Sequence, residues 1–295
     1  EINDIKKIVG LEAGKCYADA VSRAKLRYGK IVLLVDQDKD GSHIKGLCLN
    51  LIDSQWPSLL RVPGFVSYMN TPIIRATRGK ECVTFYNEVN YQEWYDQDET
   101  RAKAYAIKYY KGLGTSTAAE FKEYMRDKSL IDFEIDSKAD QLDLVFNKKR
   151  ASDRKLWLAN YNPLAINDSK LCSVGVGDFI DKEMIHFSKY DNERSIPSLI
   201  DGLKTSQRKI LFSAFKRNLT KEIKVSQFSG YVSERSAYHH GEASLNGCIV
   251  GLAQDFVGSN NVNLLHPSGQ FGTRLQGGKD AASDRYIFTK LEKIT

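Results

Sequence analysis

The feature that most constrains this chain is a short apolar run followed by an acidic turn, in IVLLVDQDKDGSHIKGL, residues 31–47. Ile31 to Val35 are all β-branched residues or leucine, which predicts a buried strand. Beyond the turn, apolar residues recur at helical spacing, which predicts a helix over residues 43–56. A strand, an acidic turn and a helix in this order are typical of α/β sheets, in which ligands bind at the carboxyl ends of strands.

The turn carries Asp36, Asp38 and Asp40 at alternate positions, which is also how an EF-hand calcium loop begins. In such a loop the last position is a bidentate glutamate and a helix comes first, whereas here Leu47 holds that position and a strand precedes the turn. A calcium loop is therefore excluded. Three carboxylates at the end of a strand suit magnesium, which keeps several waters and takes few protein ligands. A solvated acidic turn without metal is the remaining alternative.

Length and composition place the chain among globular proteins of about two domains. It has 295 residues, of which 42% are hydrophobic and 27% charged, and domains run about 100–200 residues. The longest aliphatic run is residues 31–35, far short of the ~20 residues that span a bilayer. Five cysteines without a CxxC pair argue against a disulfide framework or a zinc site and favour a reducing compartment.

One basic window is as positively charged as the whole chain. Residues 204–224, KTSQRKILFSAFKRNLTKEIK, contain seven Lys or Arg and one Glu, which gives the same net charge of +6 as the full sequence. A basic segment interleaved with aromatic residues is typical of a nucleic-acid-binding surface. An ordinary solvated helix face is the alternative.

The first part of the chain, residues 1–125, alternates strand-like and helix-like segments, which predicts a mostly parallel sheet. Ser116 or Thr117 is expected to cap a helix that runs through Met125. Further strands are expected at residues 65–69, 73–77 and 107–110.

The rest of the chain changes character twice. Residues 126–165 are charged and lack glycine, which predicts a helical connector between domains. Residues 166–295 predict several short helices, two of them capped by Asp178 and Ser206, and then a glycine-rich extended end. This order fits a helix-turn-helix or winged-helix module.

An arginine and a tyrosine stand together near the end, in FGTRLQGGKDAASDRYIF. A tyrosine hydroxyl, with a pKa of about 10, needs a base, a cation or a metal to act as a nucleophile. The guanidinium of Arg285 next to Tyr286 is suited to stabilise charge that develops on a phosphate. The chain has fifteen tyrosines, so a structural role for Tyr286 stays open.

Paired histidines, His239 and His240, occur in AYHHGEAS at the predicted start of a helix. Neighbouring residues point to different faces of a helix, which argues against a shared metal ion. Donation to a DNA phosphate at the helix N-terminus is one interpretation. An ordinary core histidine is the other.

Taken together, these segments resemble the central DNA-cleavage core of a type II DNA topoisomerase, of the single-chain kind found in eukaryotes and some large DNA viruses. The resemblance covers essentially the whole chain, and the number and order of the matching stretches make it specific. Among these stretches are KLRYGKIVLLVDQDKDGSHIKGL, YYKGLGTS, NKKR, RSIPSLIDGLKTSQRKIL, YHHGEASL, GLAQDFVGSNN and FGTRLQGGKDAASDRY.

The resemblance implies a fold of α/β plus α+β class. Residues 1–125 would be the C-terminal part of a TOPRIM domain with a parallel sheet and an acidic metal site. Residues 126–165 would be the helical connector. Residues 166–295 would be a winged-helix DNA-binding domain that carries the nucleophilic tyrosine.

The resemblance also implies roles for single residues. Asp36 and Asp38, supported by Asp40, match acidic residues that bind Mg²⁺, with Mn²⁺ or Ca²⁺ able to substitute. Tyr286 matches the nucleophile, and Arg285 matches the residue that stabilises the transition state. The positions that match DNA contacts, or that line the same groove by analogy, are Lys111, Lys148, Lys149, Lys204, Gln207, Arg208, Tyr238, His239, His240, Ser244, Arg274 and Lys279.

The implied activity belongs to a larger enzyme. It would cut both DNA strands through a 5′-phosphotyrosyl link and reseal them, as a homodimer on double-stranded DNA, without a membrane. ATP would bind the full-length enzyme outside this chain. The family's metal site also uses a glutamate in an EG-type motif upstream of the strand, and no such motif occurs before Val35. We therefore expect a fragment, from a nuclear enzyme if cellular, or from one in the host nucleus or a cytoplasmic replication site if viral.

Two other functions remain open at this point. A TOPRIM nuclease or primase would use the same acidic residues without the tyrosine. A DNA-binding module would lack chemistry in this fragment, because its metal site is incomplete. A trapped covalent protein–DNA complex would distinguish a topoisomerase from a TOPRIM nuclease or primase. Magnesium-dependent nicking of DNA would distinguish an enzyme from a DNA-binding module without chemistry.

Overall fold

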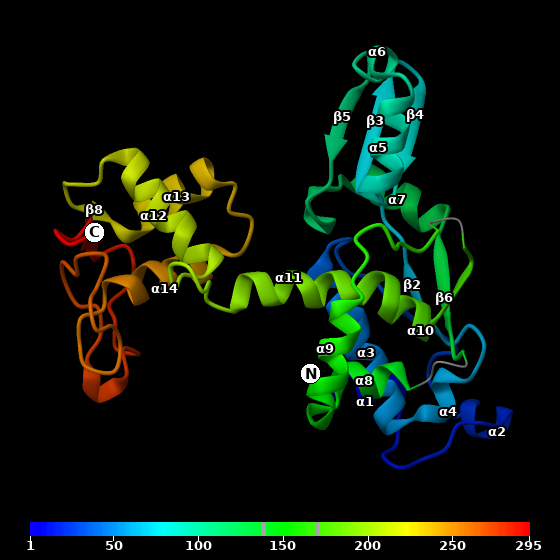
Figure 1. The fold of residues 1–295 in the computed structure, drawn as a ribbon. Coiled ribbons are helices and arrows are strands. Elements are labelled where there is room, and N and C mark those ends of the chain that lie inside the picture. The colour runs from blue at the N-terminus through cyan, green and yellow to red at the C-terminus, as the bar shows by residue number, and fades with distance from the viewer. Residues whose placement is uncertain (137–139, 169–170) are drawn as a thin grey trace. The chain divides into compact units, whose positions relative to one another are not determined.

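A computed structural model describes residues 1–136, 140–168 and 171–295. They form two compact units, Glu1–Tyr190 (unit 1) and Asp191–Thr295 (unit 2), drawn as ribbons in Figure 1. Each unit has a hydrophobic core of its own. The boundary lies later than residue 166, where the sequence placed it, because strand β7 (Ser173–Gly175) completes the sheet of unit 1. Within these ranges no helix is long and apolar enough to cross a membrane.

Unit 1 is built on a mixed sheet with the strand order β1-β2-β6-β7. β1 (Ile31–Leu33) pairs in parallel with β2 (Val66–Met69), and β6 (Leu130–Glu134) pairs in parallel with β7. The central pairing, between β2 and β6, is antiparallel. The α/β class is confirmed, but the sheet is less parallel than the sequence suggested.

Strand β6 shows that residues 126–165 are not simply a helical connector. Ile131 and Phe133 are buried and their neighbours are more exposed, which is the alternation of a half-buried strand. The later part is helical as predicted, in α8 (Gln141–Phe146) and α9 (Ala151–Ala159). Because β6 lies between β2 and β7 in the sheet, this segment belongs to the core of unit 1.

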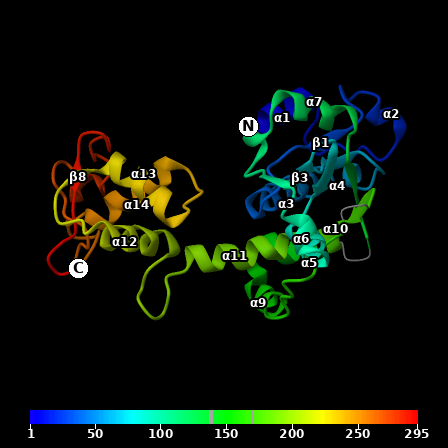
Figure 2. The same cartoon turned by 90° about the horizontal axis from the view of Figure 1, so that it is seen from above.

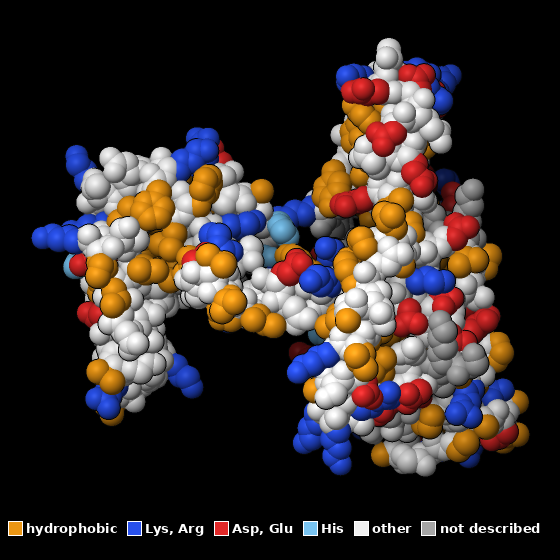
Figure 3. Space-filling view, viewed as in Figure 1, with side chains coloured by type: hydrophobic (Ala, Val, Ile, Leu, Met, Phe, Trp, Pro, Cys, Tyr) orange, Lys and Arg blue, Asp and Glu red, His pale blue; other side chains and the backbone are white. Residues whose placement is uncertain are grey.

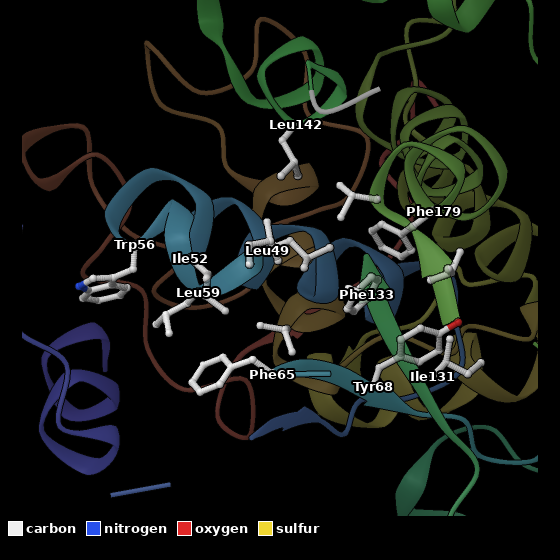
Figure 4. Packing of buried hydrophobic residues seen from close by; sticks show 14 of the residues in the cluster. Leu49, Ile52, Trp56, Leu59, Phe65, Tyr68, Ile131, Phe133, Leu142 and Phe179 are labelled. Carbon is white, nitrogen blue, oxygen red and sulfur yellow. The ribbon is translucent and has the colours of Figure 1, made fainter. Parts of the chain in front are cut away.

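The core of unit 1 lies between the sheet and helix α3 (Lys39–Gln55), and Figure 4 shows its side chains packed together. Burying one such aliphatic or aromatic side chain stabilises the fold by about 1.5–3 kcal/mol. The residues labelled in Figure 4 are Leu49, Ile52, Trp56, Leu59, Phe65, Tyr68, Ile131, Phe133, Leu142 and Phe179.

Strand β1 stands at the edge of this sheet, so the apolar run 31–35 is less buried than predicted. Ile31 and Leu33 pack against the core, whereas Val32 is 42% exposed and Leu34 is 38% exposed. The prediction of a buried strand is therefore wrong for one of its two faces.

A second sheet, of three antiparallel strands in the order β4-β3-β5, lies at one end of unit 1 (Figure 1). Strands near residues 73–77 and 107–110 were predicted, but not their antiparallel pairing. A cluster of aromatic rings from this sheet and helix α5 forms its small core. The elements are β3 (Ile74–Arg78), β4 (Glu81–Phe85), α5 (Glu88–Gln97), α6 (Glu99–Ala102) and β5 (Ala106–Tyr109).

Helix α7 (Ala118–Arg126) follows this sheet and begins as predicted. Thr117 caps it in a capping box with Glu120, so Thr117 rather than Ser116 is the cap. Unit 1 also contains the helices α1 (Ile2–Val9), α2 (Ala20–Arg23) and α4 (Pro57–Leu60).

A helical segment follows β7, made of α10 (Val176–Phe179), a π-helical turn (Ile180–Met184) and α11 (Ile185–Ser195). The prediction that Asp178 caps it is wrong, because the helix begins earlier. The carboxylate of Asp136 instead accepts a hydrogen bond from the amide of Gly177 at 3.1 Å.

Unit 2 contains the α-helices α12, α13 and α14 and a two-stranded antiparallel sheet, besides the end of α11 and a 3-10 turn (Arg274–Gln276). Figures 1 and 2 both show α12, α13 and α14 gathered together. Helix α12 does not use Ser206 as its cap; it begins one residue before Ser206, after Lys204. Three short helices with a small β-ribbon are consistent with the winged-helix module expected here. The elements are α12 (Thr205–Arg217), β8 (Ile223–Lys224), α13 (Val225–Ser236), α14 (Glu242–Ala253) and β9 (Phe288–Thr289).

Candidate functional site

The acidic turn lies between β1 and α3, at the carboxyl end of a strand in a parallel pairing. Asp38 is the N-cap of α3, and its Oδ1 accepts a hydrogen bond from the amide of Gly41 at 2.7 Å. Because aspartate is an efficient cap, the helix begins at Lys39 rather than at residue 43. Asp40 falls in the first turn of this helix, where the helix dipole favours a negative charge.

Asp36 is held by a distant part of the chain. Its Oδ1 accepts a hydrogen bond from the amide of Leu113, in the turn after β5, at 2.7 Å. Its backbone carbonyl packs against Gly41, where a Cβ would lie 1.9 Å from the carbonyl oxygen. Asp36 and Asp38 therefore each have one carboxylate oxygen engaged by a backbone amide.

This pair of carboxylates fits a hydrated divalent cation. Magnesium typically binds proteins through one or two carboxylates, with waters and substrate phosphates completing its shell. Asp36 and Asp38 supply such a set. Within residues 1–136, 140–168 and 171–295, no three or more His, Cys, Asp or Glu side chains are arranged to hold a metal ion, so the three aspartates do not form one cluster.

Tyr286 combines an exposed side chain with a firmly bonded backbone. The residue is 72% exposed, and its amide donates to the carbonyl of Ser283 at 2.9 Å, which closes a turn. The first two amides of α13 donate to the carbonyls of Ile287 and Asp284 at 3.0 and 3.2 Å. Hydrogen bonds on both sides thus fix the segment from which the hydroxyl projects.

Two neighbours complete this segment. The guanidinium carbon of Arg285 lies 6.0 Å from the centre of the Tyr286 ring, and both side chains are exposed. The side-chain amide of Asn246, on α14, donates to Oδ2 of Asp284 at 2.9 Å. Asp284 therefore fastens the Arg285–Tyr286 pair to the helical part of unit 2.

A closed loop over residues 272–280 precedes the tyrosine. The amide and the hydroxyl of Thr273 both donate to the carboxylate of Asp280 at 2.8 Å, and these bonds lower the pKa of Asp280. Gly272 has a φ of 95° and packs directly on Gly278, where a Cβ on Gly272 would lie 2.5 Å from the Gly278 Cα. The loop needs glycine at this crossing for both reasons.

Most of the predicted DNA-contacting residues are exposed, and Lys and Arg side chains project from the face of unit 2 seen in Figure 3. Gln207 and His240 are half-buried. The exposed ones in unit 1 are Lys111, Lys148 and Lys149, and those in unit 2 are Lys204, Arg208, His239, Ser244, Arg274 and Lys279.

Several of these residues also have structural partners, among them Tyr238, Arg208 and Gln207. Tyr238 is only 8% exposed and packs in the core of unit 2, with its ring edge-on to that of His240 at a centroid distance of 5.4 Å. Arg208 forms a two-pronged ion pair with Asp201, at 2.8 and 2.9 Å. Gln207 accepts a hydrogen bond from the amide of Lys204 at 2.8 Å and so helps to start α12.

Sequence reasoning missed the residues that hold the predicted site residues in place. Gly112 and Leu113 support Asp36, and Asn246 and Asp284 support the tyrosine segment. The stretch YYKGLGTS was singled out, but Lys111 was the only residue in it to which a functional role was assigned. Nothing in the spacing of residues so far apart in the chain indicates these contacts.

Two protein families match the chain. Residues 69–192 match the C-terminal associated domain of TOPRIM, and residues 194–295 match the A-type subunit of DNA gyrase/topoisomerase IV. The two matched regions meet beside the boundary between unit 1 and unit 2.

Several named proteins are similar over the whole chain. DNA topoisomerase 2 of Arabidopsis thaliana is 52% identical over 301 residues, which is 100% of this chain and 20% of that protein. Human DNA topoisomerase 2-beta is 52% identical over 310 residues, again 100% of this chain and 19% of the relative. The chain thus spans about a fifth of the length of the curated relatives it matches.

One solved structure covers nearly all of the chain. The crystal structure of the Plasmodium falciparum topoisomerase II DNA-binding, cleavage and re-ligation domain superposes with a TM-score of 0.77 at 48% identity, over 98% of this chain and 40% of that one. The matches in sequence and in structure agree from end to end. The chain belongs to the type II DNA topoisomerase family.

Proposed function

We propose that this chain is part of the DNA-cleaving core of a type II DNA topoisomerase, an isomerase that cuts both strands of a DNA duplex transiently and reseals them. The observation that carries the proposal is the Arg285–Tyr286 pair, exposed on a backbone that hydrogen bonds hold on both sides. A reactive hydroxyl needs both properties, because DNA must reach it and its position must be fixed.

The reaction that fits is a transesterification. The hydroxyl oxygen of Tyr286 attacks a DNA phosphorus, loses its proton and forms a 5′-phosphotyrosyl ester. The 3′ oxygen of the neighbouring nucleotide leaves and takes up a proton. One phosphate ester replaces another, so attack by the 3′-OH reseals the strand without a further reactant. Arg285, next to the nucleophile, is suited to stabilise the charge that develops on the phosphate.

A divalent cation belongs to this proposal as the partner of Asp36 and Asp38. Bound there, Mg²⁺ would supply positive charge to stabilise the leaving oxygen and to anchor a nearby phosphate. The residues of the chain do the holding: Asp38 is fixed as the cap of α3, and Asp36 is fixed by the amide of Leu113.

The partners we propose are double-stranded DNA and a second copy of the same protein. The exposed lysines and arginines of both units would neutralise backbone phosphates, a form of binding that weakens as salt rises. A double-strand break needs one nucleophile for each strand, and each chain supplies one candidate in Tyr286. ATP would act in the full-length protein at a site outside these residues.

The test is a trapping experiment with labelled double-stranded DNA and Mg²⁺. Denaturing the mixture should leave DNA covalently attached to the wild-type protein and none attached to Y286F, whose ring lacks the nucleophilic oxygen. Tyr28 offers a matched control, because it is also exposed, at 55%, and Y28F should form adducts as the wild type does.

Two outcomes would contradict the proposal. Adducts that persist in Y286F would show that another residue is the nucleophile. Magnesium-dependent nicking by Y286F without any adduct would favour a TOPRIM nuclease.

A further inference from the structure

The turn that follows β5 carries Lys111, one of the predicted DNA contacts. It comprises Lys111–Gly114, called here the KGLG turn, and it leads through a short 3-10 helix (Leu113–Thr115) into α7. Although 77 positions separate Leu113 from Asp36 in the chain, the turn contacts the Asp36 carboxylate directly. Two separate contacts show this.

The first contact is steric and involves Gly112. A Cβ at this position would lie 2.9 Å from Cγ and Oδ2 of Asp36 and 3.0 Å from Oδ1, well inside the ~3.5 Å of ordinary contact. The φ of Gly112 is 171°, an extended conformation open to any residue. Space beside the carboxylate, and not backbone conformation, therefore requires glycine here.

The second contact is a hydrogen bond from the amide of Leu113 to Oδ1 of Asp36. Its length, 2.7 Å, is at the short end of the range for bonds to an ionised acceptor, which are stronger than neutral ones. The amide occupies one carboxylate oxygen, while Gly112 limits how the group can turn.

The KGLG turn is itself fixed on both sides. The amide and the hydroxyl of Thr115 return to the carbonyl of Gly112, at 3.1 and 2.7 Å. The capping box at Thr117 starts α7, and the Glu120 of that box bonds back to Lys108 on β5 at 2.8 Å. The KGLG turn, which contacts Asp36, is therefore held between strand β5 and helix α7 by hydrogen bonds.

We propose that the KGLG turn is the positioning element of the metal site: Gly112 and the Leu113 amide hold Asp36 in one orientation and reserve its Oδ2 for a divalent cation. The proposal rests on the proposed function, in which Asp36 binds that cation. Groups that contact a metal-binding side chain and fix its orientation affect the affinity of the site for the metal. Their loss typically weakens metal binding roughly 10–100-fold.

A matched pair of glycines tests the steric contact. G112A places a methyl group against the carboxylate, whereas G114A, in the same turn, meets nothing within 4 Å and has no positive φ. With Mn²⁺ as a paramagnetic probe, G112A should raise the Kd roughly 10–100-fold, and G114A should leave it unchanged. The temperature of unfolding is recorded for each variant.

A second pair, at Leu113, tests the hydrogen bond and decides the matter if G112A does not fold. L113P removes the amide hydrogen, and its backbone is compatible, because the preceding Gly112 is extended and proline is tolerated where a helical turn begins. L113A removes the side chain and keeps the amide. L113P should weaken Mn²⁺ binding by a similar factor, and L113A should not.

D36N separates this proposal from the function on which it rests. If D36N binds Mn²⁺ as tightly as the wild type, Asp36 is not a cation ligand. Both the cation site of the proposed function and the positioning role of the KGLG turn then fail. If D36N weakens binding but G112A and L113P do not, the positioning proposal alone is overturned. Equal losses in G112A and G114A, or in L113P and L113A, would also overturn it.

Discussion

At the scale of single residues, the side chains proposed to react are exposed, whereas Gly112 and Asn246, which support them, are half-buried. Tyr286, Asp36 and Asp38 have residue types that suggest chemistry, so a sequence can identify them. Gly112 and Asn246 have no such signature, because their roles come from contacts with residues far away in the chain. These supporting residues could not be predicted without the fold.

The Asn246–Asp284 pair offers a prediction at this scale. In N246D two carboxylates face each other, so the bond of 2.9 Å that holds the tyrosine segment is lost. A hydrogen bond to a charged group contributes about 1.5–3 kcal/mol, so we expect N246D to lower the rate of adduct formation about tenfold or more.

The double variant N246D/D284N provides the control, because it exchanges donor and acceptor and restores the pair. It should recover most of the rate of adduct formation, as measured by trapping over time. A double variant as slow as N246D would show that the pair does not act through this bond.

At the scale of elements, the sequence pattern correctly predicted those strands, helices and caps that depend on neighbouring residues alone. The strand β1, the helix α3 and the Thr117 cap of α7 all carry their signals within a few residues. β6 was missed because its surroundings are charged, although Ile131 and Phe133 alternate as strand residues do. The antiparallel pairings were not predictable, because strand partners are chosen by packing across the whole unit.

The connection between β5 and α7 makes a prediction about pH. Partial burial disfavours the charge of Glu120, but hydrogen bonds from Lys108, Tyr110 and Thr117 prevail and lower its pKa from 4.5 to about 2. Because the pKa of Glu120 is lower in the folded protein than in the unfolded chain, its ionised form stabilises the fold. This stabilisation is complete above pH 4.5 and is lost as the pH falls from about 4.5 to about 2.

The variant E120Q lacks this titration. In urea unfolding between pH 5 and pH 2.5, the free energy of unfolding should fall less steeply in E120Q than in the wild type. E93Q, at an exposed position of α5, is the control and should follow the wild type. If the free energy of unfolding changes with pH equally in E120Q and in the wild type, the lowered pKa of Glu120 is contradicted.

At the scale of the whole molecule, the sequence predicted two main domains but placed their boundary too early. The apparent connector contributes β6 to the core of unit 1, and β7 extends that sheet, so unit 1 continues to Tyr190. A domain boundary depends on which segments pack into the same hydrophobic core. Amino-acid composition alone does not show which segments these are.

Unit 2 is predicted to fold by itself. Its core includes Ile210, Phe228, Leu245, Ile249 and Leu265, all fully buried and all supplied by residues of this unit. The isolated chain 191–295 should therefore show helical circular dichroism and one cooperative thermal transition. Gradual loss of signal on heating, without a transition, would contradict an independent core.

The identity of the nucleophile is the central claim, and mapping the attachment site tests it most directly. DNA adducts trapped with Mg²⁺ are digested with protease and nuclease, and the modified peptide is sequenced by mass spectrometry. We predict a single nucleotide-bearing residue, Tyr286, linked through the 5′ phosphate of the cleaved strand. A link at any other of the fifteen tyrosines, or through a 3′ phosphate, would contradict the account.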